Sequence, residues 1–231
     1  MPEGPVIAEM FSGIAPRYDL ANHVLSFGLD FGWRRKLAYA VAAKKPRVVV
    51  DLATGSGDVA FALKKRLGPD VEVRGLDFCR PMLAVAEQKK VALPWAQDIT
   101  FAFGDCLNLP LPDNSVDALT IAWGVRNLAD RPRGYAEMRR VLKAGGSLFV
   151  LENSQPEGWA RPLCRFYMNA IMPVAAGLLT GKPDAYRYLA VSSGGFPGRV
   201  ALAAEMTAAG FTRVRYEALG LGAVALHEAE K

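Results

Sequence analysis

Apolar positions after about Pro46 fall into short continuous runs, which alternate with longer segments of helical periodicity. Short runs bounded by Gly, Pro or Asp are typical of buried strands, and this alternation predicts a parallel sheet with crossover helices. The last of these helices is predicted to end at LKAGG, where Gly145 and Gly146 can adopt positive φ. The predicted strands are 47–53, 71–77, 99–104, 116–123 and 146–152, and the predicted helices are 58–67, 80–91 and 132–142.

The C-terminal part of the chain has a different pattern. It predicts a helix at 198–209 and strands at 211–219 and 223–228, with only a short Gly-containing loop between the two strands. Such a loop can join antiparallel strands but is too short for a parallel crossover. We therefore predict an α/β fold of the Rossmann-like class, in which a seven-stranded, mostly parallel sheet contains one antiparallel strand.

The length of the chain predicts a single domain over residues 1–231, because a chain of this size, half of it apolar, covers one sizeable core but hardly two. Two segments lie outside the alternation of strands and helices. They are an N-terminal helical cap at 1–45 and a lid-like insertion at 155–195.

Charge and cysteine content narrow the class of protein. The net charge of +5 is spread along the chain, which favours an ordinary solvated surface over a nucleic-acid face. Three scattered cysteines fit neither a disulfide framework nor a metal site and indicate a reducing compartment. The N-terminus lacks the features of a signal peptide, and no apolar stretch is long enough to span a membrane. We expect a cytoplasmic protein whose membrane contact, if any, is peripheral.

A glycine loop follows the first predicted strand. Gly55, Ser56, Gly57 and Ala60 form a GxGxxA pattern at the start of a predicted helix, which allows a nucleotide cofactor to approach the backbone closely. Asp77 ends the next predicted strand about twenty residues later, where a carboxylate can accept both ribose hydroxyls. Together they predict an adenosine-containing cofactor, with tight packing of the loop as the alternative.

Two carboxylates beside this loop bear on the identity of the cofactor. Asp51 precedes the glycines and Asp58 follows them, so the pyrophosphate of NAD would be repelled there. S-adenosylmethionine carries an ammonium and a sulfonium beside one carboxylate, so Asp51 can face the cations while loop amides hold the carboxylate. The charges thus favour S-adenosylmethionine over NAD. For Asp58 itself, an N-terminal helix cap is the simpler interpretation.

Asp105 follows the third predicted strand, where its side chain could hydrogen-bond the amino group of adenine, although a turn residue is an equal alternative. Cys106 could line the adenine pocket as a small apolar contact, and nothing around it indicates an activated thiol.

Several motifs outside the loop resemble the ubiquinone and menaquinone biosynthesis C-methyltransferase family over nearly the whole chain. They read MFSGIAPRYDLANHVLSFGLDFGWRR, DLATGSGD, GLDFCRPML, GDCLNLPLPDNSVDALTIAWGVRN, EMRRVLKAGGSLFVLE, YRYL with FP following, and VALH. The resemblance implies methyl transfer from S-adenosylmethionine to a ring carbon of a polyprenylated quinol, in particular demethylmenaquinol to menaquinol. It implies cofactor contacts at Ser56, Asp77, Asp105 and Cys106, to which we add Phe78 beside Asp77.

The chain departs from the family pattern at three places. Ala122 stands in IAWGVRN where the family often has a serine, so one hydroxyl contact to the cofactor is missing. Asn153 in LENSQP replaces an aromatic residue at the edge of the expected acceptor pocket, and GKPDAYRYL replaces GDADSYRYL.

Methylation of an aromatic carbon requires the electron-rich hydroquinone and a group that takes or stabilises the hydroxyl proton. The two histidines, His23 and His227, are expected to be structural or exposed, with His23 as a secondary candidate. Arg126 in GVRN lies where open α/β sheets bind ligands, and its guanidinium could stabilise a phenolate, although a salt bridge that holds the loop is the alternative. Tyr18 and Tyr188 are the further catalytic candidates and, together with Asp19 and Tyr186, could close over the substrate.

The segment 159–179 is rich in large apolar residues, which would suit a prenyl tail or pack on the edge of the sheet. If it holds the tail, it forms a lid with the N-terminal helix, and Arg34, Arg35 and Lys36 could assist attachment to a membrane surface. The sequence leaves open a homodimer, another small-molecule methyltransferase acting on a benzoquinol, phenol, sterol or amine, and an NAD-dependent oxidoreductase. Nucleic-acid methylation is disfavoured, because no aromatic and basic stripe is present.

Overall fold

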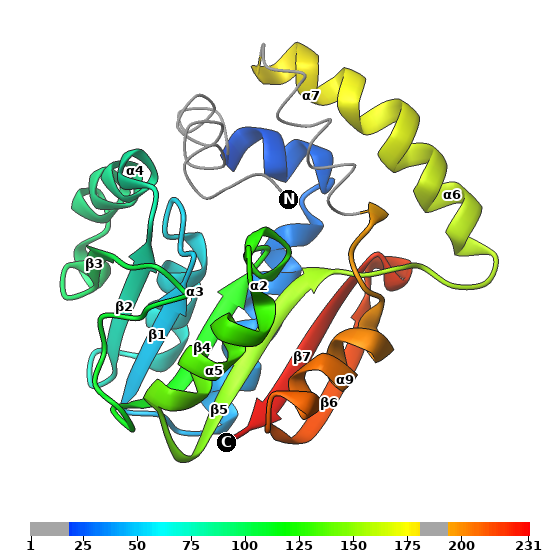
Figure 1. The fold of residues 1–231 in the computed structure, drawn as a ribbon. Coiled ribbons are helices and arrows are strands. Elements are labelled where there is room, and N and C mark those ends of the chain that lie inside the picture. Colours follow the sequence, from blue (N-terminus) through cyan, green and yellow to red (C-terminus); the bar gives the residue numbers. More distant parts are fainter. Residues whose placement is uncertain (1–18, 181–193) are drawn as a thin grey trace.

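The computed structural model describes residues 19–180 and 194–231, which contain a seven-stranded sheet in the order β3-β2-β1-β4-β5-β7-β6 (Figure 1). All neighbouring strands from β3 to β5 are parallel, and β7 runs antiparallel to both β5 and β6. The predicted sheet with a single antiparallel strand is confirmed. The bounds are β1 Val48–Leu52, β2 Glu72–Asp77, β3 Thr100–Phe103, β4 Val116–Ala122, β5 Leu142–Asn153, β6 Thr212–Leu219 and β7 Val224–Glu230.

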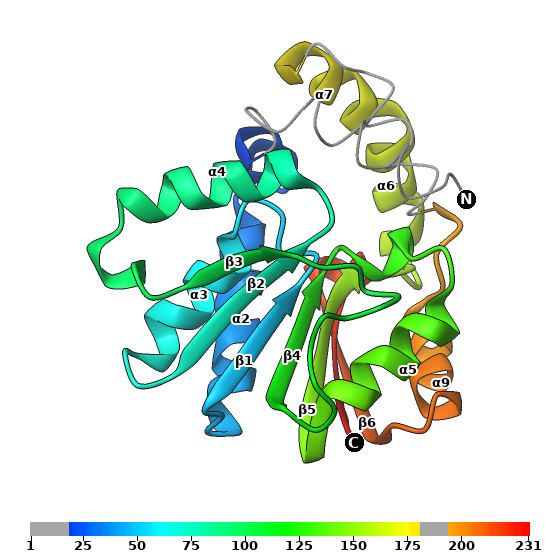
Figure 2. The ribbon, with the colours of Figure 1, turned by 60° about the vertical axis from the view of Figure 1, so that its left-hand side comes forward.

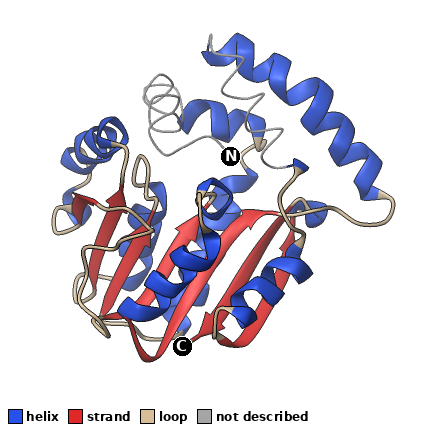
Figure 3. Cartoon of the chain, viewed as in Figure 1, coloured by secondary structure: helices blue, strands red, loops and turns tan. Residues whose placement is uncertain are grey.

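Helices cover both faces of the sheet (Figures 2 and 3). One face packs on α5 and α9, and the other packs on α2 and α3, because alternate residues of β1 point to opposite sides. Val50 belongs to the first apolar cluster and Val49 to the second. The helices are α2 Leu29–Ala43, α3 Asp58–Leu67, α4 Arg80–Val91, α5 Arg131–Val141 and α9 Arg199–Ala208.

The LKAGG segment differs from the prediction. It lies within β5, which begins at Leu142, and only Gly145 has positive φ, at 73°. Gly146 does not need positive φ. Instead, a Cβ there would lie 2.9 Å from the carbonyl oxygen of Lys143 and 3.1 Å from that of Asp117. The residues at this point bulge out of the pairing between β4 and β5, and glycine permits the close approach of the two backbones.

The segment after β5 forms a helical arm that lies beyond the carboxyl end of this strand (Figure 1). It consists of α6 Ala160–Phe166, the π-helical turn Tyr167–Ile171 and α7 Met172–Thr180. Tyr167 Oη donates a hydrogen bond to the carbonyl oxygen of Leu25, 2.5 Å away, so the arm contacts the N-terminal helical residues 19–25. No helix within the described part of the chain is long and apolar enough to cross a membrane.

Candidate functional site

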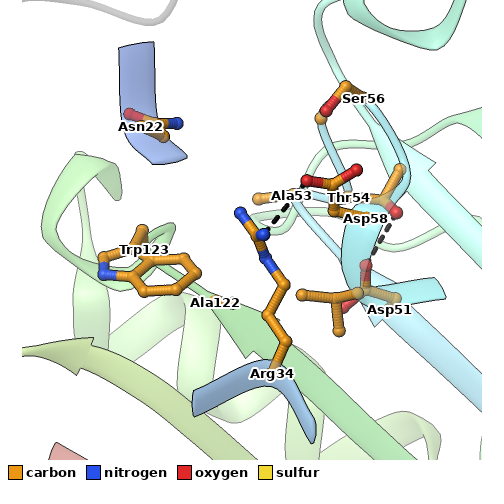
Figure 4. A pocket seen from close by; sticks show the side chains of 11 residues that line it. Asn22, Arg34, Asp51, Ala53, Thr54, Ser56, Asp58, Ala122 and Trp123 are labelled. Atoms are coloured by element: carbon orange, nitrogen blue, oxygen red, sulfur yellow. Dashed lines mark hydrogen bonds and ion pairs between the residues drawn. The ribbon is translucent and has the colours of Figure 1, made fainter. Parts of the chain in front are cut away.

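A pocket lies at the carboxyl ends of β1 and β4, below the N-terminal helical residues (Figure 4). The ends of β1 and β4 and the β1–α3 loop supply most of its lining. Helix α2 contributes the side chain of Arg34. The lining residues are Asn22, Arg34, Asp51, Ala53, Thr54, Gly55, Ser56, Asp58, Val59, Ala122 and Trp123. The pocket therefore brings together four of the predicted cofactor residues, Asp51, Gly55, Ser56 and Ala122.

Asp51 is the fourth residue of β1, just before the glycine loop, and its side chain is almost fully buried. Thr120 Oγ1 donates to Oδ1 at 2.6 Å, and Thr54 Oγ1 donates to Oδ2 at 2.7 Å. Burial raises the pKa of Asp51 to about 7, although these two hydroxyl groups oppose the shift. A group that titrates near neutral pH at the edge of a pocket is typical of a functional site.

The backbone of the loop requires glycine at two positions. Gly55 and Gly57 have φ of 56° and 85°, a region that favours glycine. A Cβ at Gly57 would lie 2.9 Å from the rings of Phe61 and Phe101, so tight packing is a second reason for glycine at this position. Gly55 has more space, and the nearest atom to its Cβ would be Met82 Cε at 3.4 Å.

Asp77 ends β2 and holds the glycine loop through its backbone. Its Oδ2 accepts from the amide of Gly55 at 2.8 Å, and its Oδ1 accepts from the amide of Cys79 at 2.7 Å. Burial raises the pKa of Asp77, and these amide hydrogen bonds oppose the shift. Phe78 is half-buried between β2 and α4. The carboxylate of Asp77 therefore lies at the loop, while its contact with a ribose stays a prediction.

Asp105 and Cys106 follow β3 and are not part of the pocket lining that the described residues form. Asp105 is exposed and accepts from the amide of Leu107 at 2.9 Å, which is the turn geometry that the alternative predicts. Burial raises the pKa of the Cys106 thiol to about 12, so this thiol stays protonated and unactivated, as expected.

Asp58 is the first residue of α3 and does not cap it, because the N-cap residue is Gly57. The interpretation of Asp58 as the helix cap is therefore wrong. Its carboxylate instead forms ion pairs with Arg34, at 3.1 Å, and with Lys89. Lys89 also contacts Asp19 at 2.9 Å, and Asp19 accepts from Ser56 Oγ at 2.5 Å. These charges fasten the N-terminal helical residues to the glycine loop.

Arg34 is buried rather than available to a membrane surface, so that expectation is wrong for this residue. Its Nη1 donates to Asp30 Oδ2 at 2.6 Å, and its guanidinium carbon lies 5.5 Å from the centre of the Trp123 ring. The sequence carries a signal for this burial, because Arg34 shares one helical face with Leu37 and Val41, which are both in the core. Of its two basic neighbours, Arg35 is exposed and Lys36 pairs with Glu217.

Arg126 lies on the short helix Val125–Asn127 after β4, where its side chain is buried with the carboxylate of Glu152. The predicted loop-holding salt bridge is therefore present, and within the described part of the chain Arg126 does not line the pocket. Sequence reasoning missed Glu152. The signal was an acidic residue within the continuous apolar run of β5, since a buried charge requires a partner. Tyr18, Tyr186 and Tyr188 lie outside the described residues.

The two histidines have structural surroundings. His227 is buried, its Nε2 lies 2.8 Å from the carbonyl oxygen of Arg199, and burial lowers its pKa. His23 Nδ1 lies 2.6 Å from Asp30 Oδ2, and its ring stacks on Phe31 with centroids 4.2 Å apart. His23 is nonetheless near the pocket, because its Nε2 is 4.0 Å from Asp58 Oδ2.

Known proteins match this chain over almost all of its length. The model of the ubiE/COQ5 methyltransferase family matches residues 3–231. The demethylmenaquinone methyltransferase of Thermus thermophilus is 47% identical over 96% of this chain and 100% of its own length, and that of Deinococcus radiodurans is 46% identical over 99% and 94%. Among solved structures, a SAM-dependent methyltransferase from Thermotoga maritima superposes with a TM-score of 0.70 at 18% identity, covering 97% of this chain and 99% of its own. That structural likeness supports the Rossmann-like fold.

Proposed function

Because the chain belongs to the ubiE/COQ5 methyltransferase family, we propose that it transfers a methyl group from S-adenosylmethionine to a ring carbon of demethylmenaquinol, giving menaquinol. The chain is thus an S-adenosylmethionine-dependent C-methyltransferase. The observation that carries the proposal is identity of 47% and 46% to two demethylmenaquinone methyltransferases whose lengths this chain covers almost completely. The alternative of an NAD-dependent oxidoreductase has no such support.

The residues of the pocket fit the charges of S-adenosylmethionine. This cofactor supplies a methyl group activated by a sulfonium cation. Asp51 faces the pocket as a carboxyl group whose ionised form would attract the ammonium and the sulfonium. Gly55 and Ser56 bring the backbone of the loop to the same pocket, and Asp77 holds that loop from behind. We propose that Gly57, Phe78, Asp105, Cys106 and Ala122 complete the cofactor site.

The acceptor must be a quinol, because the ring carbon needs electron density from a hydroxyl group that loses its proton as the new bond forms. We assign Arg126 the role of stabilising the developing phenolate, since a guanidinium cannot accept the proton at neutral pH. Its position after the carboxyl end of β4 suits this role, because open α/β sheets bind ligands there. We assign Tyr18 and Tyr188 to hydrogen bonds with the quinol.

The prenyl tail and the membrane would meet the helical arm. Trp159, Leu163 and Phe166 are exposed along α6 and just before it, with relative accessibilities of 75%, 56% and 61%. Arg161 and Arg165 are exposed beside them, a composition typical of helices that lie in a membrane interface. We propose a cytoplasmic enzyme that attaches peripherally to the inner face of the membrane, as a monomer or a homodimer.

Product analysis tests the proposed reaction. The protein would be incubated with methyl-labelled S-adenosylmethionine and with either demethylmenaquinol or the corresponding demethylated benzoquinol, both kept reduced. We expect label in a ring carbon of menaquinol, and no label when the acceptor is oxidised to the quinone. If neither quinol were methylated, the proposed acceptor would be contradicted. If calorimetry showed that the protein binds NAD but not S-adenosylhomocysteine, the proposed cofactor would be contradicted.

A further inference from the structure

The side chain of Arg34 enters the pocket from α2, an element that is separate in sequence from the glycine loop. Figure 4 shows the guanidinium directed into the pocket between Trp123 and the carboxyl groups of Asp51 and Asp58. It is 8% exposed, and the indole of Trp123 covers it at 5.5 Å. A guanidinium in this position is oriented by packing and is partly shielded from water, so its interaction with an anion is strengthened.

The neighbouring acidic side chains do not use all of the hydrogen-bonding capacity of Arg34. Among the described residues, both of its ion pairs, to Asp30 and to Asp58, leave from Nη1. A guanidinium has five N–H donors. Asp58 also forms an ion pair with Lys89, so Arg34 is not the only cation that neutralises its carboxylate among the described residues. The remaining donors of Arg34 can therefore serve a ligand without leaving Asp58 unpaired.

The pocket thus presents a carboxyl group and a guanidinium cation from two different elements. Asp51 is carried by β1 and Arg34 by α2, and both line the same space with the amide-rich loop of Gly55 and Ser56. The free amino acid end of S-adenosylmethionine is a zwitterion, with an ammonium and a carboxylate on one carbon. Lys89 is unsuited to this carboxylate, because it contacts Asp19 and Asp58 and is not among the lining residues that the structure describes.

We propose that Arg34 binds the carboxylate of the methionyl end of S-adenosylmethionine, while Asp51 attracts the ammonium on the same carbon. The inference rests on the proposed cofactor and adds a binding residue that belongs to α2. On the buried face of α2, Arg34 lies between its ion-pair partner Asp30 and the apolar residues Leu37, Ala38 and Val41, so packing and this ion pair hold its guanidinium toward the pocket. Loop amides alone would provide dipoles, whereas the guanidinium provides a full positive charge and a planar pair of donors.

Calorimetry with two ligands separates this role from a purely structural one. S-adenosylhomocysteine has the amino acid end, whereas 5′-methylthioadenosine has the same adenosine and thioether but lacks it. For Arg34→Gln we expect affinity for S-adenosylhomocysteine to fall about tenfold to a hundredfold, while affinity for methylthioadenosine changes less than about twofold. Arg34→Lys should lose less than Arg34→Gln, and the exposed neighbour Arg35→Gln should bind both ligands as the wild type does.

Retained binding of methylthioadenosine also shows that the variant is folded around the pocket. The proposal is overturned if Arg34→Gln binds S-adenosylhomocysteine normally, or if it loses both ligands in equal proportion, which would mean that Arg34 only holds α2 against α3. Failure of the wild-type chain to bind S-adenosylhomocysteine would remove the proposed cofactor together with this inference, so the two failures are distinguishable.

Discussion

Arg126 Nη1 donates to Glu152 Oε1 across 2.5 Å, with 3% of one side chain and 0% of the other exposed. The carboxylate also accepts from the amide of Asn153 at 2.8 Å and lies 3.3 Å from the amide of Arg126. Within the described residues, Arg126 Nε is buried without a hydrogen-bond partner. The pair therefore joins the ends of β4 and β5 and leaves the Nε donor of the buried guanidinium unused.

Loss of the charge on Glu152 should destabilise the fold. Glu152→Gln keeps the shape of the side chain but leaves the guanidinium of Arg126 buried without its counter-charge, so we expect the free energy of unfolding to fall by about 3 kcal/mol. Urea denaturation at neutral pH measures this change. The same substitution in the exposed pair of Lys36 with Glu217, Glu217→Gln, should change stability by less than about 1 kcal/mol. Equal effects of the two variants would contradict the importance of burial.

Replacement of the guanidinium should impair the reaction more than binding of the cofactor. Arg126→Lys keeps a positive charge beside Glu152 but loses the planar donors, so we expect kcat to fall about a hundredfold if the guanidinium stabilises the phenolate. Affinity for S-adenosylhomocysteine should change less than about twofold, because Arg126 is not among the described residues that line the pocket. Steady-state kinetics with the quinol measure kcat, and calorimetry measures the affinity for S-adenosylhomocysteine. A parallel loss of both would instead indicate a loop-holding role.

The fold was predictable because local signals agree with the tertiary structure. The predicted bounds of α3 and α4 are those observed, since glycines with positive φ flank α3 and proline occupies the first turn of α4. The start of β5 was missed, because its bulge depends on pairing with β4. The glycine loop was predicted from its spacing, and Asp51 from its charge beside that loop. Arg34 and Glu152 were not, since their roles depend on which residues face them across elements far apart in sequence.

The pH dependence of ligand binding should report on Asp51. Because burial raises its pKa to about 7, most of this carboxyl group is protonated at pH 6 in the free protein. The ammonium of S-adenosylhomocysteine favours the ionised form, so binding should release a proton and affinity should rise between pH 5.5 and about 7, by at most about tenfold per pH unit. Calorimetry in buffers of different ionisation enthalpy measures both quantities.

Asp51→Asn should bind S-adenosylhomocysteine more weakly and lose this pH dependence. His23→Asn, which alters the side chain 4.0 Å from Asp58, should retain it.

The raised pKa of Asp51 also makes a prediction for the stability of the fold. Between about pH 4 and 7 the folded state keeps a proton that the unfolded chain releases, so this group stabilises the fold at low pH and its contribution is lost as the pH rises. If the affinity of the wild type for S-adenosylhomocysteine were constant from pH 5.5 to 7, the proposed contact between Asp51 and the ammonium would be contradicted.

Restoration of a hydroxyl group at position 122 should strengthen cofactor binding. Ala122 ends β4 and lines the pocket, at the position where the family resemblance of IAWGVRN implies a serine. In Ala122→Ser the new hydroxyl can donate or accept one hydrogen bond, so we expect affinity for S-adenosylhomocysteine to rise about three- to tenfold. Ala122→Val, which adds bulk without a hydroxyl, is the matched control and should weaken binding. No gain in Ala122→Ser would mean that the hydroxyl does not reach the ligand.

The helical arm should attach the protein to lipid through its exposed aromatic residues. Trp159 and Phe166 are 75% and 61% exposed, and each would remove a large apolar surface from water on entering the interface. We expect Trp159→Ser and Phe166→Ser each to weaken co-sedimentation with vesicles of phosphatidylcholine and phosphatidylglycerol about tenfold. Trp95→Ser, at an exposed tryptophan on the short helix Pro94–Ala96, is the control and should bind as the wild type does.

Salt and acceptor length distinguish attachment to lipid from recognition of the tail. Arg161 and Arg165 would contact anionic headgroups, so binding to the vesicles should weaken when the salt concentration rises. The Trp159 and Phe166 variants should methylate a water-soluble acceptor without a prenyl chain as well as the wild type does, yet lose activity on the long-chain quinol in vesicles. An equal loss of activity on both acceptors would mean that these side chains only stabilise the folded arm. Unchanged activity on both acceptors would contradict a role of the arm in attachment to lipid and in binding the tail.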